Sequence, residues 1–329
     1  RNINVRVGFY TNSTCKSIGD LYMKTYLNGI KLMPEKIWMP NYWINIEQPD
    51  KIDIDYLLNE LNVPESFLKD IEDPEERPRI EYEDEWQMII LRIPTKGHDT
   101  GYAYTTVPLG IFLKNDLIIS VCFYENEMIG DFIRYNQRKE IGFNNPYDLV
   151  LQLIFSAAVW YMKYLKQLNI IIKESEKELE RSIKNQELQA LLQIEKCFVF
   201  FITSLKGNTI LLHRIKHDKR SSKYIDPDQV EDVEIEMRQA LETSNIYSDI
   251  LAGMMDAYAS VIGNNMGDIM KQLTSISLIL MIPTLIASLY GMNVPNSLQD
   301  SPYGFPIILI ASITLSTFGV WLFRKRRWF

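Results

Sequence analysis

Two long uncharged segments lie near the C-terminal end of the chain. Residues 272–299 contain no Asp, Glu, Lys or Arg, and neither do residues 301–323. Helices over Leu273–Tyr290 and Phe305–Phe323 would each be long enough to cross about 30 Å of hydrocarbon. The pattern therefore predicts two membrane crossings joined by a short connector, residues 293–304.

A single helical pattern leads into the first crossing. Asp226 is suited to be an N-cap and Pro227 to be the first helical residue, and the apolar periodicity then stays helical as far as Met292. One helix over this range would contain about 66 residues and span roughly 100 Å. Because an isolated helix is only marginally stable in water, such a helix needs packing partners along its length.

The part of the chain before this helix mixes strand-like and helical patterns. Strand-length runs rich in β-branched and aromatic residues alternate with short helical patterns at residues 55–61 and 65–71. The expected strands are Asn4–Tyr10, Lys36–Glu47, Glu81–Pro94 and Tyr102–Phe123, the last with a hairpin turn at Asn115–Asp116. A mixed α and β domain is therefore expected before the helices.

Basic residues gather on one side of the predicted membrane hairpin. Arg324, Lys325, Arg326 and Arg327 follow the second crossing, and Lys271 precedes the first. The positive-inside rule then places both termini and the soluble part in the cytoplasm. The expected location of the hairpin is the cell's inner (plasma) membrane. The formal net charge is -7 despite the basic tail. An acidic soluble part argues against nucleic acid as a partner.

These patterns give the predicted fold class and its division into parts. We expect an α+β cytoplasmic domain, followed by a long stalk helix and a two-helix transmembrane hairpin. The expected parts are an α/β domain (1–140), charged cytoplasmic helices (141–225), a stalk helix that continues into the first crossing (226–292), an external loop (293–304), the second crossing (305–323) and a basic cytoplasmic tail (324–329).

The first crossing carries a stripe of small, polar, Met and Leu residues at steps that average 3.5, the spacing of a coiled-coil seam. Its members are Gly267, Met270, Leu273, Ser277, Met281, Thr284 and Ser288. In lipid such a stripe is expected to face other protein or a water-filled lumen. One helix does not enclose a lumen, so a lumen requires several copies around a symmetry axis. The alternative is a plain two-helix anchor, in which Ser and Thr hydroxyl groups simply bond back to the preceding turn.

The end of the first crossing resembles the CorA family of magnesium channels. The run Tyr290-Gly291-Met292-Asn293 contains Gly-Met-Asn, follows the Met281-Ile282-Pro283-Thr284 run, and precedes a second crossing with a basic-aromatic tail. The resemblance extends to residues 251–258 of the stalk and to residues 77–81 and 109–113 of the soluble domain. It therefore covers most of the chain.

The resemblance implies a homopentameric funnel in a lipid membrane, with Gly291, Met292 and Asn293 as the selectivity filter. Because Mg²⁺ sheds its water reluctantly, a ring of Asn293 amides at the outer mouth suits a hydrated ion. The membrane potential would drive entry with about 4.6 kcal/mol per 100 mV for a divalent cation. Mg²⁺ is then both substrate and regulatory ligand, no cofactor is needed, and Co²⁺ and Ni²⁺ are the other substrates to consider.

The resemblance also implies a regulatory metal site between subunits. Asp70 and Asp232 match two acidic positions whose carboxylates, from neighbouring subunits, would bridge a hydrated Mg²⁺ and hold the funnel shut. Lys69 departs from the family pattern, in which Glu is often found, and Gly267 replaces a polar side chain at a pore position. Asp256 continues the stripe toward the inner entrance, where it would line the entrance or pair with a neighbouring helix.

Two further points complete the sequence-based interpretation. In the family arrangement, Arg324, Lys325, Arg326 and Arg327 contribute to a basic collar near the inner pore mouth. A membrane-anchored oligomeric scaffold or sensor without transport is the alternative function. No nucleophile–base set, zinc motif or glycine-rich phosphate loop is apparent in the sequence, so an enzyme is not expected.

Overall fold

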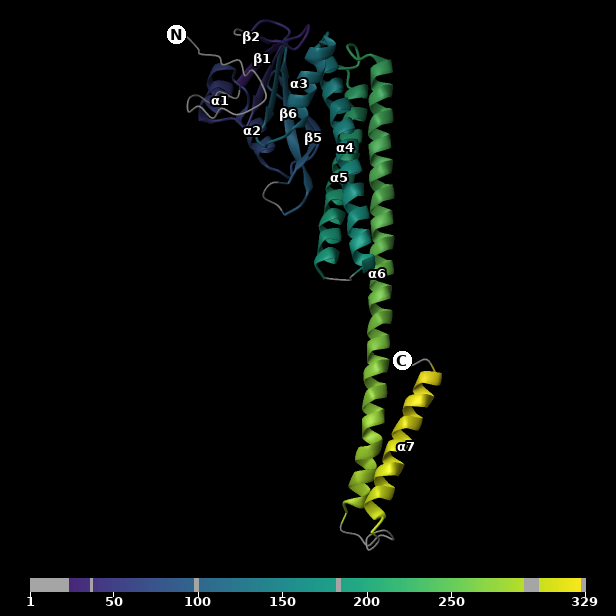
Figure 1. The fold of residues 1–329 in the computed structure, drawn as a ribbon. Coiled ribbons are helices and arrows are strands. Elements are labelled where there is room, and N and C mark those ends of the chain that lie inside the picture. Colours follow the sequence, from purple (N-terminus) through teal and green to yellow (C-terminus); the bar gives the residue numbers. More distant parts are fainter. Residues whose placement is uncertain (1–23, 36–37, 98–100, 182–184, 293–301, 327–329) are drawn as a thin grey trace. The chain divides into compact units, whose positions relative to one another are not determined.

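The structure, a computed structural model, describes residues 24–35, 38–97, 101–181, 185–292 and 302–326. The chain forms two compact units, residues 1–252 and residues 253–329, and the long helix α6 contributes to both (Figure 1). The expected strand Asn4–Tyr10 lies outside the described residues.

A seven-stranded sheet is the centre of the first unit, in the order β2-β1-β3-β7-β6-β5-β4. Neighbouring strands are antiparallel except β3 and β7, which are parallel. The strands are β1 (Lys24–Asn28), β2 (Pro34–Glu35), β3 (Tyr42–Glu47), β4 (Arg79–Glu83), β5 (Trp86–Lys96), β6 (Tyr104–Lys114) and β7 (Leu117–Cys122).

Helices cover both faces of this sheet, which explains why its central strands are apolar almost without interruption. Every residue of β5 except Lys96 is buried, as is typical of a strand with a layer on each side. One layer contains α1 (Lys51–Asp55), the π-helical turn Tyr56–Glu60 and α2 (Glu65–Glu72), and Phe67 and Ile71 of α2 belong to the buried core. The other layer contains α4 (Pro146–Arg181) and α5 (Asn185–His217), which contact β5 and β6.

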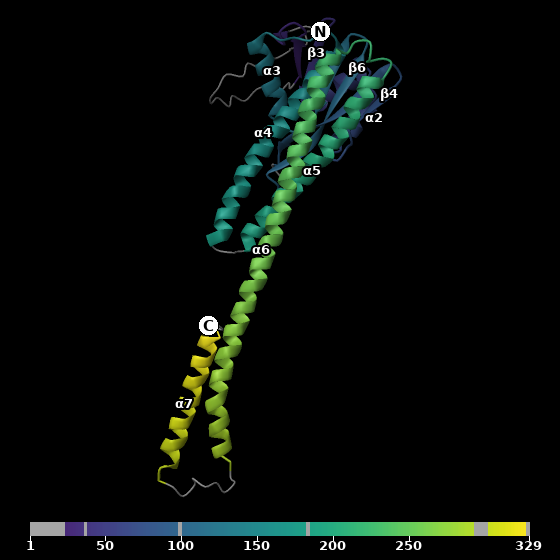
Figure 2. The same ribbon diagram turned by 90° about the vertical axis from the view of Figure 1, so that its right-hand side faces the viewer.

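The first part of α6 (Pro227–Tyr290) lies along α4 and α5, as both ribbon views show (Figures 1 and 2). Its Gln229 donates to Asp148 of α4 at 2.9 Å. Farther along, the ring of Tyr247 packs edge-on against Phe198 of α5, with centroids 6.4 Å apart. These contacts supply, within the first unit, the partners that so long a helix needs in water.

Four local expectations differ from the structure. Of the expected strand Lys36–Glu47, only Tyr42–Glu47 is a strand among the described residues. The run Glu81–Pro94, expected as one strand, is divided by a tight turn at Asp84–Glu85, where Asp84 has a positive φ of 51°. The helix expected at 55–61 begins at Lys51, behind an Asp50 capping box, and continues as a π-helical turn. Helix α3 (Met128–Lys139) was not expected at all. The hairpin at Asn115–Asp116 is confirmed, because β6 and β7 pair around it.

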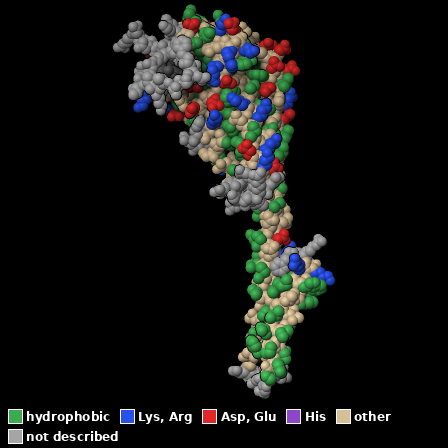
Figure 3. Space-filling view, in the orientation of Figure 1, with side chains coloured by type: hydrophobic (Ala, Val, Ile, Leu, Met, Phe, Trp, Pro, Cys, Tyr) green, Lys and Arg blue, Asp and Glu red, His purple; other side chains and the backbone are tan. Residues whose placement is uncertain are grey.

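The second unit consists of the C-terminal part of α6 and α7 (Gly304–Lys325). By length and composition both helices are candidates to span a membrane, with mean hydropathies of 1.9 and 2.0 over their most apolar windows. Hydrophobic side chains cover much of the surface of this unit, with basic side chains near the end of α7 (Figure 3). The predicted architecture of an α/β domain, one long helix and a helical hairpin is confirmed.

Candidate ion pathway and regulatory carboxylates

One face of α6 packs against α7 in the second unit. Along this face of α6, Ser275 is buried and Ile279, Ile282 and Ile286 are half-buried, at steps of four, three and four residues. On α7, Gly319 lies close to Ile279 and Ile282, so that α7 approaches α6 over a glycine. Small residues at such a contact let two helices pack closely in a membrane.

The predicted pore stripe lies on the other side of α6. At about 100° per residue, the stripe centres about 180° from the face that packs on α7. Met270, Leu273 and Met281 are 53%, 58% and 61% exposed, and Ser277, Thr284 and Ser288 are exposed as well. Gly267 is half-buried. The second unit therefore leaves this stripe uncovered in a single copy of the chain.

Hydroxyl groups on the uncovered side of α6 donate to the preceding helical turn. Ser277 Oγ donates to the carbonyl of Leu273 at 2.9 Å, and Thr284 Oγ1 donates to that of Leu280 at 3.0 Å. These side chains therefore do bond back to the preceding turn, as the alternative interpretation of the stripe as part of a plain anchor expects. It uses the hydroxyl proton and leaves lone pairs on each oxygen, so these oxygens still have acceptor capacity for water or a cation.

The filter residues are only partly described. Gly291 and Met292 follow the last residue of α6, and the Gly291 N–H continues the helical pattern by donating to Ala287 O at 2.8 Å. Asn293 lies outside the described residues. The structure thus places the first two residues of the triplet directly after α6.

The residues expected at the inner side of the membrane are exposed where they are described. Asp256 is exposed on α6. Arg324 and Lys325 form the last turn of α7, with the Lys325 ammonium 5.0 Å from the ring of Trp321, and Arg326 follows as the C-cap. Cations at a helix C-terminus are favoured by the helix dipole. Arg327 lies outside the described residues.

Asp70 of α2 belongs to a cluster of charges centred on Arg79 of β4. Arg79 Nη2 lies 2.5 Å from Asp70 Oδ2, Arg79 Nε donates to Glu81 Oε2 at 2.9 Å, and Arg79 Nη1 pairs with Glu76. Partial burial raises the pKa of Asp70 above its ordinary value, and the nearby carboxylates add to this effect while Arg79 opposes it. A single guanidinium shared among three carboxylates does not neutralise the cluster.

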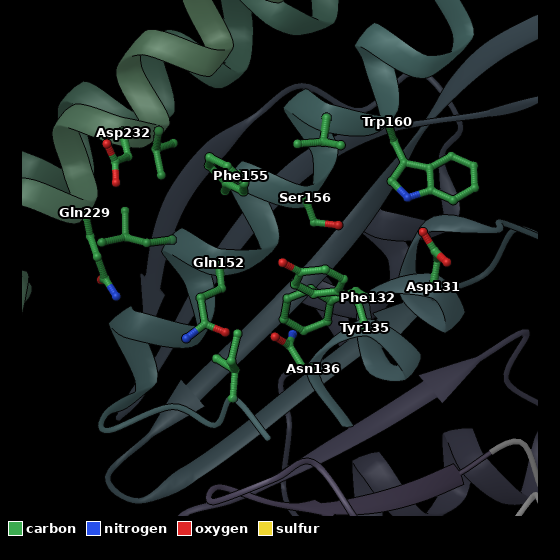
Figure 4. Close-up of a pocket in the computed structure, with 14 residues that line it drawn as sticks. Asp131, Phe132, Tyr135, Asn136, Gln152, Phe155, Ser156, Trp160, Gln229 and Asp232 are labelled. Atoms are coloured by element: carbon green, nitrogen blue, oxygen red, sulfur yellow. The ribbon is translucent and has the colours of Figure 1, made fainter. Parts of the chain in front are cut away.

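Asp232 lies on the first turns of α6, at the edge of a cavity of about 570 Å³ in the first unit. Figure 4 shows Asp232 and Gln229 of α6 near Phe155 of α4, with Asp131 of α3 placed across the cavity. Asp70 is not among the residues that line this cavity. Within one chain, Asp70 is thus paired with Arg79 of β4, whereas Asp232 lies at a cavity lined by residues of α3, α4 and α6.

No metal site is complete in a single copy, as far as the described residues show. Among them, no group of three or more His, Cys, Asp or Glu side chains could hold a metal ion. The resemblance implies that the Asp70 and Asp232 of such a site come from two different copies. The sequence does not point to Arg79 as the partner of Asp70, although the Arg77-Pro78-Arg79 run is part of the resemblance to the family.

Comparisons with known proteins cover nearly the whole chain. The family model described as CorA-like Mg2+ transporter protein matches residues 40–326. The cobalt/magnesium transport protein CorA of Methanocaldococcus jannaschii is 27% identical over 296 residues, covering 87% of this chain and 90% of that protein. The protein of the same name from Thermotoga maritima is 26% identical over 304 residues, covering 87% and 83%.

Solved structures show the same fold. The complete CorA magnesium transporter of M. jannaschii matches with a TM-score of 0.79 and 24% identity, covering 94% of this chain and 100% of that one. The full-length CmaX protein matches with a TM-score of 0.68 and 17% identity, covering 95% and 100%. The sequence-based assignments to a transporter family and to a non-enzymatic class are confirmed, and the chain belongs to the CorA-like Mg²⁺ transporter family.

Proposed function

We propose that this chain is one subunit of a channel that moves hydrated Mg²⁺ down its electrochemical gradient, with Co²⁺ and Ni²⁺ as the competing substrates. The observation that carries the proposal is the uncovered stripe of α6, from Gly267 to Ser288, on the side away from α7. A helix face that carries Ser277 and Thr284 is poorly suited to lipid and well suited to a water-filled lumen. Family membership supports the same conclusion.

The proposed assembly is a homopentamer in which α6 lines the pore and α7 lies outside it. In this arrangement Gly291, Met292 and Asn293 form the filter at the outer mouth. Met270 and Met281 would form apolar constrictions that close by dewetting, and Thr284 and Ser288 would offer oxygens to the hydrated ion. Family resemblance and the two opposed faces of α6 support this assembly. Identical subunits and divalent cations are thus the proposed partners.

The proposed location is the inner (plasma) membrane, with both termini in the cytoplasm. The basic residues at the end of α7 support this orientation through the positive-inside rule. We assign residues 1–225 to the cytoplasm, residues 226–292 to the stalk and first crossing, and residues 293–304 to the outside. We expect a thiol reagent added outside intact cells to label a single cysteine introduced at Ser297. It should not label a single cysteine introduced at Ser222.

Ion flux through the full-length protein in liposomes tests the filter. We expect Asn293→Ala to reduce Mg²⁺ flux at least tenfold at equal protein, since the amide ring is lost. The matched control is Asn296→Ala in the same connector, which we expect to keep wild-type flux. Parallel measurements with Mg²⁺, Co²⁺, Ni²⁺ and Zn²⁺ identify the substrate. No flux of any of these ions through the wild-type protein would instead favour the anchored scaffold or sensor.

We propose that cytoplasmic Mg²⁺ bound between Asp70 of one copy and Asp232 of the next holds the channel closed. The support is the partly exposed Asp70 in an incompletely neutralised cluster, the exposed Asp232, and the match of both to family positions. Asp70→Asn with Asp232→Asn should leave flux running at internal Mg²⁺ that stops the wild type. Glu72→Gln, an exposed neighbour on α2, is the matched control. Unaltered inhibition in the double variant would remove these carboxylates from the sensor.

A further inference from the structure

Arg79 holds Asp70 by one of three ion pairs that it makes at once. Its other two partners are Glu76, which immediately precedes the Arg77-Pro78-Arg79 run, and Glu81 on the same strand β4. Among the residues that the structure describes, Arg79 is the only cation within 4.0 Å of Asp70. If Asp70 separates from Arg79, the guanidinium therefore keeps two carboxylate partners. Its charge stays paired, and the surrounding side chains do not need to rearrange.

Arg79 itself is held in place from several directions. It is a residue of β4 and pairs with Ile90 of the buried strand β5. The loop before it is attached to the sheet by the buried Arg92, whose Nη1 donates to the carbonyls of Pro74 and Glu76. The strand and the loop fix the main chain of Arg79, and Glu76 and Glu81 still hold its guanidinium when Asp70 separates from it.

The other side of this loop is packed against α5. Pro78 lies so close to Gly207 that a Cβ on the glycine would be 2.8 Å from Pro78 Cγ. Asp70 lies near the end of the short helix α2, and the side chains of Asp70 and Arg79 are 31% and 28% exposed. The carboxylate of Asp70 therefore has access to solvent, and the guanidinium keeps Glu76 and Glu81 as partners when Asp70 turns to bind a cation.

We propose that Arg79 competes with the regulatory divalent cation for the carboxylate of Asp70, and thereby sets the cation concentration at which the channel closes. The proposal rests on the proposed function, in which Asp70 binds that cation. A divalent cation and a guanidinium both seek the same oxygens and repel each other, so each weakens the binding of the other. When the cation leaves, Arg79 recaptures Asp70 and neutralises part of the charge that the open state would otherwise carry.

The test compares full-length protein variants by their Mg²⁺ midpoint, the Mg²⁺ concentration that gives half of the full effect, measured in two ways. One is inhibition of ion flux by internal Mg²⁺ in liposomes, and the other is the Mg²⁺-dependent rise in the melting temperature of the detergent-purified protein. For Arg79→Gln we expect the midpoint to fall about three- to tenfold, since a competing partly exposed ion pair is removed. Arg79→Lys, which keeps the charge but loses the fork of donors, should give an intermediate shift and also serves if Arg79→Gln does not fold.

Controls separate competition from a structural role. Arg77→Gln, in the same loop and without an ion pair among the described residues, should leave the midpoint unchanged. In the Asp70→Asn background, Arg79→Gln should have no further effect, because there is no carboxylate left to compete for. A structural role would lower the melting temperature in both backgrounds without moving the midpoint, and that result would overturn the proposal.

The failure of the proposed function has a different signature. If Asp70→Asn alone leaves the Mg²⁺ midpoint unchanged, Asp70 is not part of the sensor and both proposals are wrong. If Asp70→Asn raises the midpoint while Arg79→Gln and Arg79→Lys do not lower it, the sensor stands and only the competition by Arg79 is excluded.

Discussion

Gly319 of α7 lies against Ile282 of α6, where a Cβ on the glycine would be 3.7 Å from Ile282 Cδ1. This is an ordinary van der Waals distance, so alanine fits but a long side chain does not. We expect Gly319→Leu to push α7 away from α6 and to lower the unfolding free energy of the hairpin by about 1–3 kcal/mol. Gly319→Ala is the matched control. Thermal unfolding in detergent measures the effect, and equal melting temperatures for both variants would argue against close packing here.

The two faces of α6 should differ in their access to water within the assembled channel. The test uses a chain in which Cys15, Cys122 and Cys197 are replaced by Ser. A single cysteine is then introduced at one position of α6 at a time. The stripe positions are Ser277 and Thr284, and the matched positions toward α7 are Ile279 and Ile286.

We expect a charged, membrane-impermeant thiol reagent to modify the cysteines of Ser277→Cys and Thr284→Cys and to block flux. The cysteines of Ile279→Cys and Ile286→Cys should react at least tenfold more slowly, since thiolates form only where water reaches them. The rates are read by mass spectrometry of the purified protein. Faster reaction of the cysteines at positions 279 and 286 would contradict a lumen along the stripe through Ser277 and Thr284.

The sequence predicts one of these faces and not the other, for a physical reason. The stripe through Ser277 and Thr284 stands out because small and polar residues contrast with an apolar background. The face toward α7 is made mainly of Ile, as are many lipid-facing positions, so composition does not distinguish it. This face can be identified only from the position of Gly319, which contacts Ile279 and Ile282 when α7 packs against α6.

Arg92 should contribute strongly to the stability of the first unit. It is 8% exposed and donates to the carbonyls of Pro74, Glu76 and Thr106, and also to the hydroxyl of Thr106. Arg92→Met would remove the donor from the buried carbonyl of Thr106 and from the partly buried carbonyls of Pro74 and Glu76, and we expect a loss of about 3 kcal/mol. Arg77→Met, on the exposed part of the same loop, should cost little. Chemical denaturation followed by tryptophan fluorescence compares the two, and similar losses would contradict the role given to Arg92.

In the first unit some features follow from local sequence patterns, and others depend on tertiary packing. The β6–β7 hairpin is predictable because Asn115–Asp116 interrupts two apolar runs. The turn at Asp84 is harder to see, since charged residues continue on both sides of it. The contact between Asp70 and Arg79 joins a helix and a strand across the Pro74–Pro78 loop, and no local pattern encodes it.

The half-buried carboxyl group of Glu47 should make stability depend on pH. Burial raises the pKa of Glu47 above its ordinary value, although the hydrogen bond from Asn45 Nδ2 at 2.9 Å opposes this. Because the folded-state pKa is the higher one, the contribution of Glu47 to stability is present below the unfolded-state pKa and is lost as pH rises through the folded-state pKa.

Glu47→Gln removes this charge and keeps an acceptor for Asn45. Relative to the wild type, its melting temperature should therefore rise as the pH is raised from about 4 to about 7. Glu60→Gln, at an exposed position, is the matched control and should show no such trend. Melting curves of the full-length protein across this pH range provide the measurement. If the difference in melting temperature between Glu47→Gln and the wild type does not change with pH, the prediction is wrong. Glu47 would then carry the same charge in the folded and the unfolded state.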